Sequence, residues 1–137
     1  MDVLLSIKPK YVDAILKGEK EYEFRKTIFK DRNIQNAYIY SSSPVKKIVG
    51  FFIVDEIIED HPLTIWEKCR GKTGIEKDEF LAYFGSRRKG YAIKISNLRV
   101  FRTPVDPKTF CPEFVPPQSF RYFDCPDIKS IETEEKK

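Results

Sequence analysis

The chain has 137 residues, enough for one domain with an ordinary core, and its composition is 41% hydrophobic and 14% aromatic with a net charge of +4. No apolar run approaches the roughly 20 residues of a membrane span, and no signal-peptide core follows the N-terminus, so we expect an intracellular, cytoplasmic protein. Three cysteines without close spacing and a single histidine, His61, argue against a zinc cluster. We therefore expect free thiols, no metal and no cofactor.

The first predicted elements are a short strand and an amphipathic helix. Leu4 to Ile7 form an apolar run that is typical of a buried strand. Pro9 ends this run and suits the first turn of a helix, where its missing N–H costs nothing. The apolar side chains of residues 11–16 then share one helical face, and Gly18 can take the left-handed conformation that closes the helix.

A second strand is predicted over residues 20–26, where aromatic and ionisable side chains alternate. Alternation places Tyr22 and Phe24 on one face and Glu23 and Arg25 on the other. It also separates Lys20 from that pair, so the three converge only if Lys20 lies in the turn before the regular strand. Two interpretations remain open: an exposed edge strand whose charges block aggregation, or the floor of a polar pocket.

The middle of the chain predicts two strands joined by a turn. The first strand covers Asn36 to Tyr40, and the run Ser41–Pro44 is a turn rich in hydrogen-bonding side chains. Residues 47–58 are β-branched and aromatic and predict one long strand. Gly50 inside it indicates a bulge or the close approach of other backbone or of a ligand.

Two short helices are predicted next. One covers residues 62–69 and carries Trp66, a residue type that more often packs in a core than stacks on a base. The other has a capping-box signature, Thr73 with Glu76, and an apolar stripe that ends before Gly85.

The last third of the chain predicts strands and an extended crossing. Residues 91–101 form one strand candidate, and residues 104–117 form a proline-rich crossing with a turn of helix near Asp106. Residues 120–123 predict a final strand. We place the domain at residues 1–126 and a charged, frayed tail at residues 127–137.

Together these elements predict an α+β fold, a mixed and mostly antiparallel β-barrel of five to six strands with two to three short helices. Strands do not alternate regularly with helices, which argues against a doubly wound parallel sheet. The sequence contains neither a G-x-G-x-x-G nor a Walker loop, and no Ser–His–acid pattern is present. These absences argue against nucleotide cradles of those types and against a serine-hydrolase triad.

The charge is distributed unevenly along the chain. Residues 1–50 carry 10 Lys and Arg against 6 Asp and Glu, and residues 71–103 carry 8 against 3. Residues 51–70 reverse this balance, with 2 against 5. Two basic segments favour a face that holds a phosphate backbone. The acidic segment, Asp55 to Asp60, favours instead a regulatory surface for a protein partner.

The opening motif, LLSIKPKYVDAILKGEKEYEFRK, closely resembles that of the ASCH family, small β-barrel domains related in fold to the PUA RNA-binding domains. Further matching motifs follow in the same order as in the family: Tyr40–Pro44, Val49–Gly50, Trp66, Tyr83–Phe84, Gly90–Ile93 and Pro116–Phe120. The resemblance covers nearly the whole chain. It implies a cleft between barrel and helices that holds RNA or a nucleobase and is lined by the GxKxxxxR strand.

One enzyme branch of the ASCH family removes the acyl group of N4-acetylcytidine with a Lys, a Thr and a Glu in that cleft. Lys20 matches the lysine, but Glu23 stands at the threonine position, and residues 70–73 read Arg-Gly-Lys-Thr near the expected glutamate. An ionised carboxylate offers neither a nucleophile nor a donor of the hydroxyl type. We also expect Glu23 to hold Lys20 as a charged ammonium.

We therefore predict a domain that binds nucleic acid, with RNA as the expected partner. The alternative is an enzyme in the same cleft, a modified-nucleoside amidohydrolase or a ribonuclease. The third possibility is a regulatory module that binds a protein partner through the acidic segment. The candidate catalytic residues are Lys20 and Glu23. The candidate binding residues are Arg25, Ser41, Ser42, Lys46, Arg87, Arg88, Gln118 and Ser119.

Overall fold

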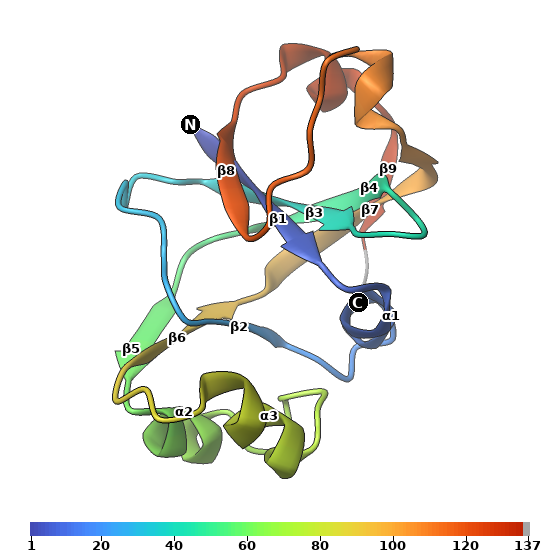
Figure 1. The fold of residues 1–137 in the computed structure, drawn as a ribbon. Helices are drawn as coiled ribbons and strands as arrows, with labels where there is room; N and C mark the ends of the chain where they lie inside the picture. The colour runs from blue at the N-terminus through green and yellow to red at the C-terminus, as the bar shows by residue number, and fades with distance from the viewer. Residues whose placement is uncertain (136–137) are drawn as a thin grey trace.

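A computed structural model describes residues 1–135 and has an α+β fold (Figure 1). Within that range the elements are β1 (Asp2–Ile7), α1 (Pro9–Leu16), β2 (Tyr22–Arg25), β3 (Asn36–Ser41), β4 (Lys47–Ile53), β5 (Ile57–Asp60), α2 (Pro62–Lys68), α3 (Lys77–Phe84), β6 (Gly90–Lys94), β7 (Ser96–Val105), the 3-10 helix η1 (Pro107–Thr109), β8 (Phe120–Phe123), the 3-10 helix η2 (Pro126–Ser130) and β9 (Thr133–Glu135). None of the helices in residues 1–135 is both long and apolar enough to cross a membrane.

The strands form two sheets. One has six strands in the order β8-β1-β3-β4-β7-β9, and the other has three in the order β2-β6-β5. Only β1 and β3 run parallel among the paired strands of the described region, so the prediction of a mixed, mostly antiparallel arrangement is confirmed. The predicted strand number was too low, because residues 1–135 contain nine strands, and hydrogen bonds do not close these strands into one continuous ring.

Two of the predicted long strands are each divided between the two sheets, which corrects the sequence prediction. The run over residues 47–58 forms β4 in the large sheet and β5 in the small one. The run over residues 91–101 likewise forms β6 in the small sheet and the first part of β7 in the large one. Polar residues stand at both divisions, Asp55 and Glu56 in the first run and Lys94 and Ser96 in the second, and the sequence prediction passed over them.

Three hydrophobic clusters hold the layers together. The first lies where α1 and both sheets meet and includes Val3, Val12 and Phe52. The second covers the other face of the large sheet and includes Leu4, and the third packs α2 and α3 against the small sheet (Figure 1). Val3 and Leu4 therefore point to opposite buried faces, which explains why β1 is a continuous apolar run.

The two helices below the small sheet confirm one prediction and correct another. Trp66 packs in the third cluster with its ring centroid 5.1 Å from that of Phe80, as expected for a packing residue. The predicted capping box is wrong, because α3 has Glu76 as its N-cap and that side chain makes no capping hydrogen bond. Thr73 instead pairs with Lys20 in an isolated antiparallel bridge, and its hydroxyl donates to the Ile75 carbonyl at 3.0 Å.

Residues 127–135, expected from the sequence to be a charged tail, contain part of η2 and the whole of β9. Ile128 is 1% exposed and packs in the second hydrophobic cluster. β9 pairs with β7, with Val100 opposite Glu134. The last two positions of the predicted tail, 136 and 137, lie outside the described residues.

Candidate functional site

β2 carries the centre of the site. It lies between the large sheet and the α2–α3 pair (Figure 1), and all four of its residues are buried. Tyr22 and Phe24 pack in the third hydrophobic cluster, as the alternation predicted. Glu23 and Arg25 point the other way and are only 6% and 7% exposed. The two charged side chains are thus not part of a solvated edge strand.

Arg25 joins three segments of the chain through its guanidinium group. Its Nη2 atom donates to Glu23 Oε2 at 2.7 Å and to the Ser6 carbonyl at 3.0 Å. Its Nη1 atom donates to the carbonyl and the hydroxyl of Ser119, both at 3.1 Å. The planar fork of arginine suits this divided set of acceptors. The Nε atom of Arg25 has no hydrogen-bond partner among the described residues.

Lys20 joins the same group from outside β2. It lies before the regular strand, in the bridge to Thr73, which is the placement required for convergence with Glu23. Its side chain is 2% exposed, and its Nζ atom is 3.9 Å from Glu23 Oε1 and donates to the Thr73 carbonyl at 3.3 Å. The ammonium also lies 4.3 Å from the centroid of the Phe24 ring.

Gly74 makes this close approach of the two segments possible. Its φ is +66°, and a Cβ atom there would collide with the Cβ atom of Lys20. Glycine is therefore needed at this position for both conformation and space. The turn around Gly74 therefore packs directly against Lys20.

Burial lowers the pKa of Lys20, and the nearby Glu23 only partly opposes this effect. The positive charge of Arg25 lowers the pKa of Lys20 further. Glu23 therefore does not offset the effect of burial on the pKa of Lys20. The geometry gives the reason, because Arg25 binds the carboxylate at 2.7 Å while Lys20 stays at 3.9 Å.

Lys20, Glu23 and Arg25 line a cavity of about 790 Å³, which we call the charged cavity. Ser42, Lys46, Arg87, Gln118 and Ser119, all predicted from the sequence, line it as well. Two further predicted residues do not. Ser41 is 2% exposed and buried in β3, and Arg88 lines a neighbouring hollow.

Sequence reasoning missed several residues that line the charged cavity, among them Ser6, Lys8, Tyr11 and Tyr83. Tyr11 donates a hydrogen bond of 2.8 Å to Glu79, and burial together with this carboxylate raises the pKa of Tyr11 to about 12. Tyr11 belongs to the apolar face of α1 in the sequence pattern, so no signal separated it from a core residue.

The charged cavity has the groups of a binding site for a polar, anionic ligand. Glu23 is the only carboxylate that lines it in the described part of the chain, whereas five lysines and arginines besides Lys20 do so: Lys8, Arg25, Lys26, Lys46 and Arg87. No group of three or more His, Cys, Asp or Glu side chains in residues 1–135 is arranged to hold a metal ion. Cations, hydroxyl groups and aromatic rings are the chemistry that this cavity offers.

Known proteins match the chain over most of its length. A family model described as Domain of unknown function (DUF365) matches residues 1–114. An ASCH domain-containing ribonuclease from Zymomonas mobilis is 26% identical over 124 residues, which cover 88% of this chain and 83% of that protein.

Two longer proteins of Ureaplasma parvum are similar only in part. They are named ATP synthase subunit alpha and large ribosomal subunit protein uL22, and both are 28% identical, over 109 and 105 residues. The matched region spans 14% and 33% of their lengths, so the likeness concerns one segment of each.

Solved structures of the Z. mobilis ASCH protein have the same fold. One aligns with a TM-score of 0.83 at 24% identity and covers 93% of this chain and 91% of that one. A tyrosine-to-phenylalanine variant aligns with a TM-score of 0.81 at 25% identity and covers 90% of each chain. The resemblance seen in the opening motif is thereby confirmed. The chain belongs to the DUF365 family, and its fold is the PUA-like fold of the ASCH domain.

Proposed function

We propose that this protein binds RNA and holds one unpaired nucleotide in the charged cavity. The observation that carries the proposal is a buried pair, Arg25 with Glu23, at the floor of a cavity with a basic rim. The cavity volume of about 790 Å³ lies within the range of small-ligand sites, roughly 300–1,000 Å³. The name of the Z. mobilis relative, a ribonuclease, supports RNA as the class of ligand.

The two parts of a nucleotide match two parts of the cavity. Glu23 Oε1 and the Ser42 and Ser119 hydroxyls offer acceptors and donors to a base edge. Lys46 and Arg87 are exposed cations on the cavity lining and suit a phosphate. Proteins read RNA sequence mainly on unpaired bases, because side chains cannot enter the deep, narrow major groove of an A-form duplex.

The acidic segment gives less support to a protein-interaction module. Glu59 lies 3.7 Å from both Arg32 and Lys89, and Asp60 lies 3.2 Å from Lys68. These carboxylates already have cationic neighbours within the chain, which reduces the negative charge available to a partner.

Base preference tests the binding proposal. We expect the wild-type protein to bind one of four single-stranded RNA homopolymers at least about tenfold more tightly than the others, as one well-paired base edge provides. Glu23→Gln should abolish this preference, because the amide presents a donor group where the carboxylate only accepts. Fluorescence anisotropy with labelled octamers measures both.

The matched control is Glu21→Gln, which removes the same charge at an exposed position of the neighbouring turn. It should leave the base preference as in the wild type. A Glu23→Gln protein that keeps the wild-type preference contradicts the proposal, as does a wild type with no preference at all.

RNA cleavage is a second candidate, favoured by the lowered pKa of Lys20 and by the name of the Z. mobilis relative. A neutral amine next to a ribose can accept the proton of its 2′-hydroxyl. The 2′ oxygen then bonds to the adjacent phosphorus, and the bond from phosphorus to the 5′ oxygen breaks. A cyclic phosphate forms, and the departing 5′ oxygen takes a proton from water.

Incubation of labelled RNA tests this second candidate. We expect strand cleavage that a 2′-deoxy strand resists, and a loss of about 10²- to 10⁴-fold in rate for Lys20→Met. If the RNA stays intact, or if the Lys20→Met protein still cleaves it, cleavage that depends on Lys20 is rejected. Only the binding proposal then remains. Consumption of N4-acetylcytidine in a parallel reaction would instead support the amidohydrolase alternative, which Glu23 and the internally bonded Thr73 hydroxyl disfavour.

A further inference from the structure

A second hollow, of about 730 Å³, adjoins the charged cavity, and we call it the basic groove. Its lining contains no carboxylate among the described residues but contains six cations: Lys26, Lys30, Arg32, Arg87, Arg88 and Lys89. So dense a set of like charges creates a positive potential that attracts a polyanion.

The basic groove and the charged cavity are neighbours that share part of their walls. Lys26, Thr27 and Arg87 line both of them. Tyr91 of the basic groove also stands opposite Arg25 in the β2–β6 pairing, so one strand pair connects the two sites. A chain molecule with one unit in the charged cavity can thus continue into the basic groove.

Few of the groove cations are neutralised within the protein. Arg32 and Lys89 share the single carboxylate of Glu59, at 3.7 Å each, and all three side chains are exposed. Lys30, Arg87 and Arg88 have no ion-pair partner within 4.0 Å anywhere in residues 1–135.

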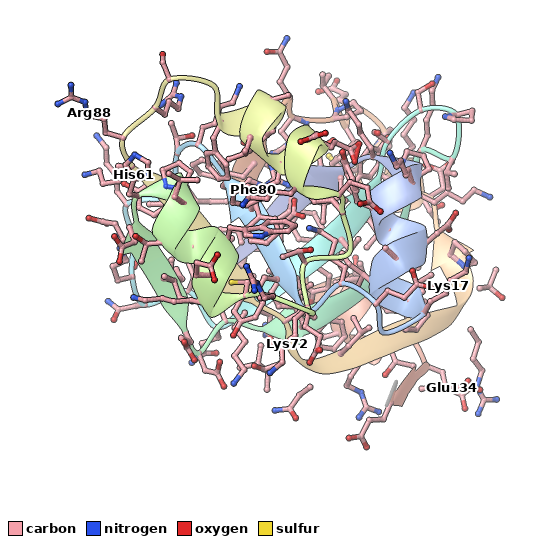
Figure 2. All side chains as sticks on the ribbon, turned by 90° about the horizontal axis from the view of Figure 1, so that it is seen from below. Lys17, His61, Lys72, Phe80, Arg88 and Glu134 are labelled. Carbon is pink, nitrogen blue, oxygen red and sulfur yellow. The ribbon has the colours of Figure 1, made fainter. Side chains whose placement is uncertain are left out.

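Three of the groove cations lie outside the packed core. Lys30, Arg87 and Arg88 are exposed, and none belongs to a hydrophobic cluster. In Figure 2 the Arg88 side chain extends away from the ribbon at the edge of the molecule. These side chains can therefore be removed without opening the core.

We propose that the basic groove binds the phosphodiester backbone next to the nucleotide held in the charged cavity. The ligand is then a single strand of RNA rather than a free nucleotide. This inference rests on the proposed function, because the nucleotide in the charged cavity determines which part of the strand lies in the basic groove. A single strand fits because a base that enters a cavity must be unpaired, while its neighbours keep their phosphates at the surface.

The salt dependence of binding tests the basic groove. We expect the Lys30→Ala/Arg88→Ala double variant to bind an RNA octamer more weakly than the wild type. The association constant K falls as salt is added, so the slope of log K against log salt concentration is negative. Its magnitude should decrease by about 0.7 for each phosphate that the protein no longer neutralises, hence by about 1.4 for two phosphates. The affinity of the double variant for a nucleoside monophosphate should match that of the wild type, because neither residue lines the charged cavity.

The matched control is Lys108→Ala, an exposed lysine that lines neither hollow. It should leave the octamer slope unchanged. A double variant with the wild-type octamer slope overturns the groove assignment, and so does an equal loss with Lys108→Ala. Equal affinity for an octamer of glutamate would overturn the assignment of the groove to a phosphodiester strand.

Failure of the two proposals can be told apart. If Glu23→Gln keeps the wild-type base preference while the double variant loses octamer affinity, the nucleotide cavity is rejected and the groove stands as a polyanion site. If the reverse holds, only the groove is rejected. A wild type that binds no RNA octamer at low salt overturns both.

Discussion

Two buried cations compete for one carboxylate at the floor of the charged cavity. Arg25 donates to Glu23 at 2.7 Å, whereas Lys20 stays 3.9 Å away and has a carbonyl and an aromatic ring as its other neighbours. A buried ammonium with so little compensation costs stability. Groups with strongly perturbed pKa values occur preferentially at functional sites.

Replacing Lys20 by Met should therefore stabilise the protein at neutral pH. Because burial lowers the pKa of Lys20, the unfolded state binds more protons than the folded state as the pH rises toward 10.5, the ordinary value. The stability contributed at this position rises with pH in that window. We expect the advantage of Lys20→Met in the free energy of unfolding to shrink between neutral pH and about pH 10.

Chemical denaturation of both proteins at the two pH values measures this difference. Lys17→Met, at an exposed lysine on the end of α1, serves as the control and should show no such trend. A Lys20→Met protein that is less stable than the wild type at neutral pH would contradict the prediction. So would a stability advantage of Lys20→Met that is the same at both pH values.

At the scale of elements, a tight turn between α2 and α3 sets the position of Lys20. Thr73 pairs with Lys20 in the isolated bridge, and the Glu21 amide donates to the Lys72 carbonyl at 2.9 Å. Gly74 follows with a φ of +66° and leaves no room for a Cβ atom beside Lys20. The turn and the segment before β2 thus form one unit.

Gly74→Ala should cost more stability than Gly71→Ala. Both glycines have positive φ values, +66° and +81°, and an alanine at either position loses about 1 kcal/mol from backbone strain. Only the Cβ atom at position 74 also collides with Lys20, while position 71 has nothing within 4 Å. We expect at least about 1 kcal/mol of additional loss for Gly74→Ala in urea denaturation.

The pair also tests whether the turn positions the site. Gly74→Ala should weaken RNA binding, and Gly71→Ala should leave the affinity unchanged under conditions where both are folded. Equal stability losses in the two variants would show that the turn can move away from Lys20 at little cost.

At the scale of the molecule, the C-terminal segment closes the second hydrophobic cluster. Ile128 of η2 is 1% exposed, and β9 extends the large sheet beside β7. Phe110 and Phe114 before β8, and Cys125 and Ile128 after it, pack in the same cluster as Leu4 and Tyr38. The segment predicted as a separate tail thus contributes to the same core as β1.

Ile128→Ala should lower the free energy of unfolding by about 2 to 4 kcal/mol, because it leaves a cavity in a closed cluster. Val115→Ala, at a side chain that is 70% exposed, should change it by less than about 0.5 kcal/mol. Thermal or chemical denaturation measures both. A loss at Ile128 no larger than that at Val115 would mean that the core is complete without residues 127–135.

The local features of the site were predictable because they depend on neighbours in sequence. Pro9 and Gly18 bound α1 as expected, with a φ of +80° at Gly18. The period of two in β2 separated Tyr22 and Phe24 from Glu23 and Arg25. Gly50 was also predicted correctly as a point of close approach, since a Cβ atom there would collide with the Arg99 carbonyl.

The sequence by itself determined the α+β class, the first helix, the alternation in β2 and eight of the residues that line the charged cavity. Only the tertiary structure decided that two predicted strands divide between two sheets, that Thr73 pairs with Lys20 instead of capping α3, and that Ile128 packs in the second hydrophobic cluster. The reason is that burying an apolar side chain is favourable whichever element covers it. Which face it meets, and how far a buried lysine is shielded from water, depends on segments distant in the chain.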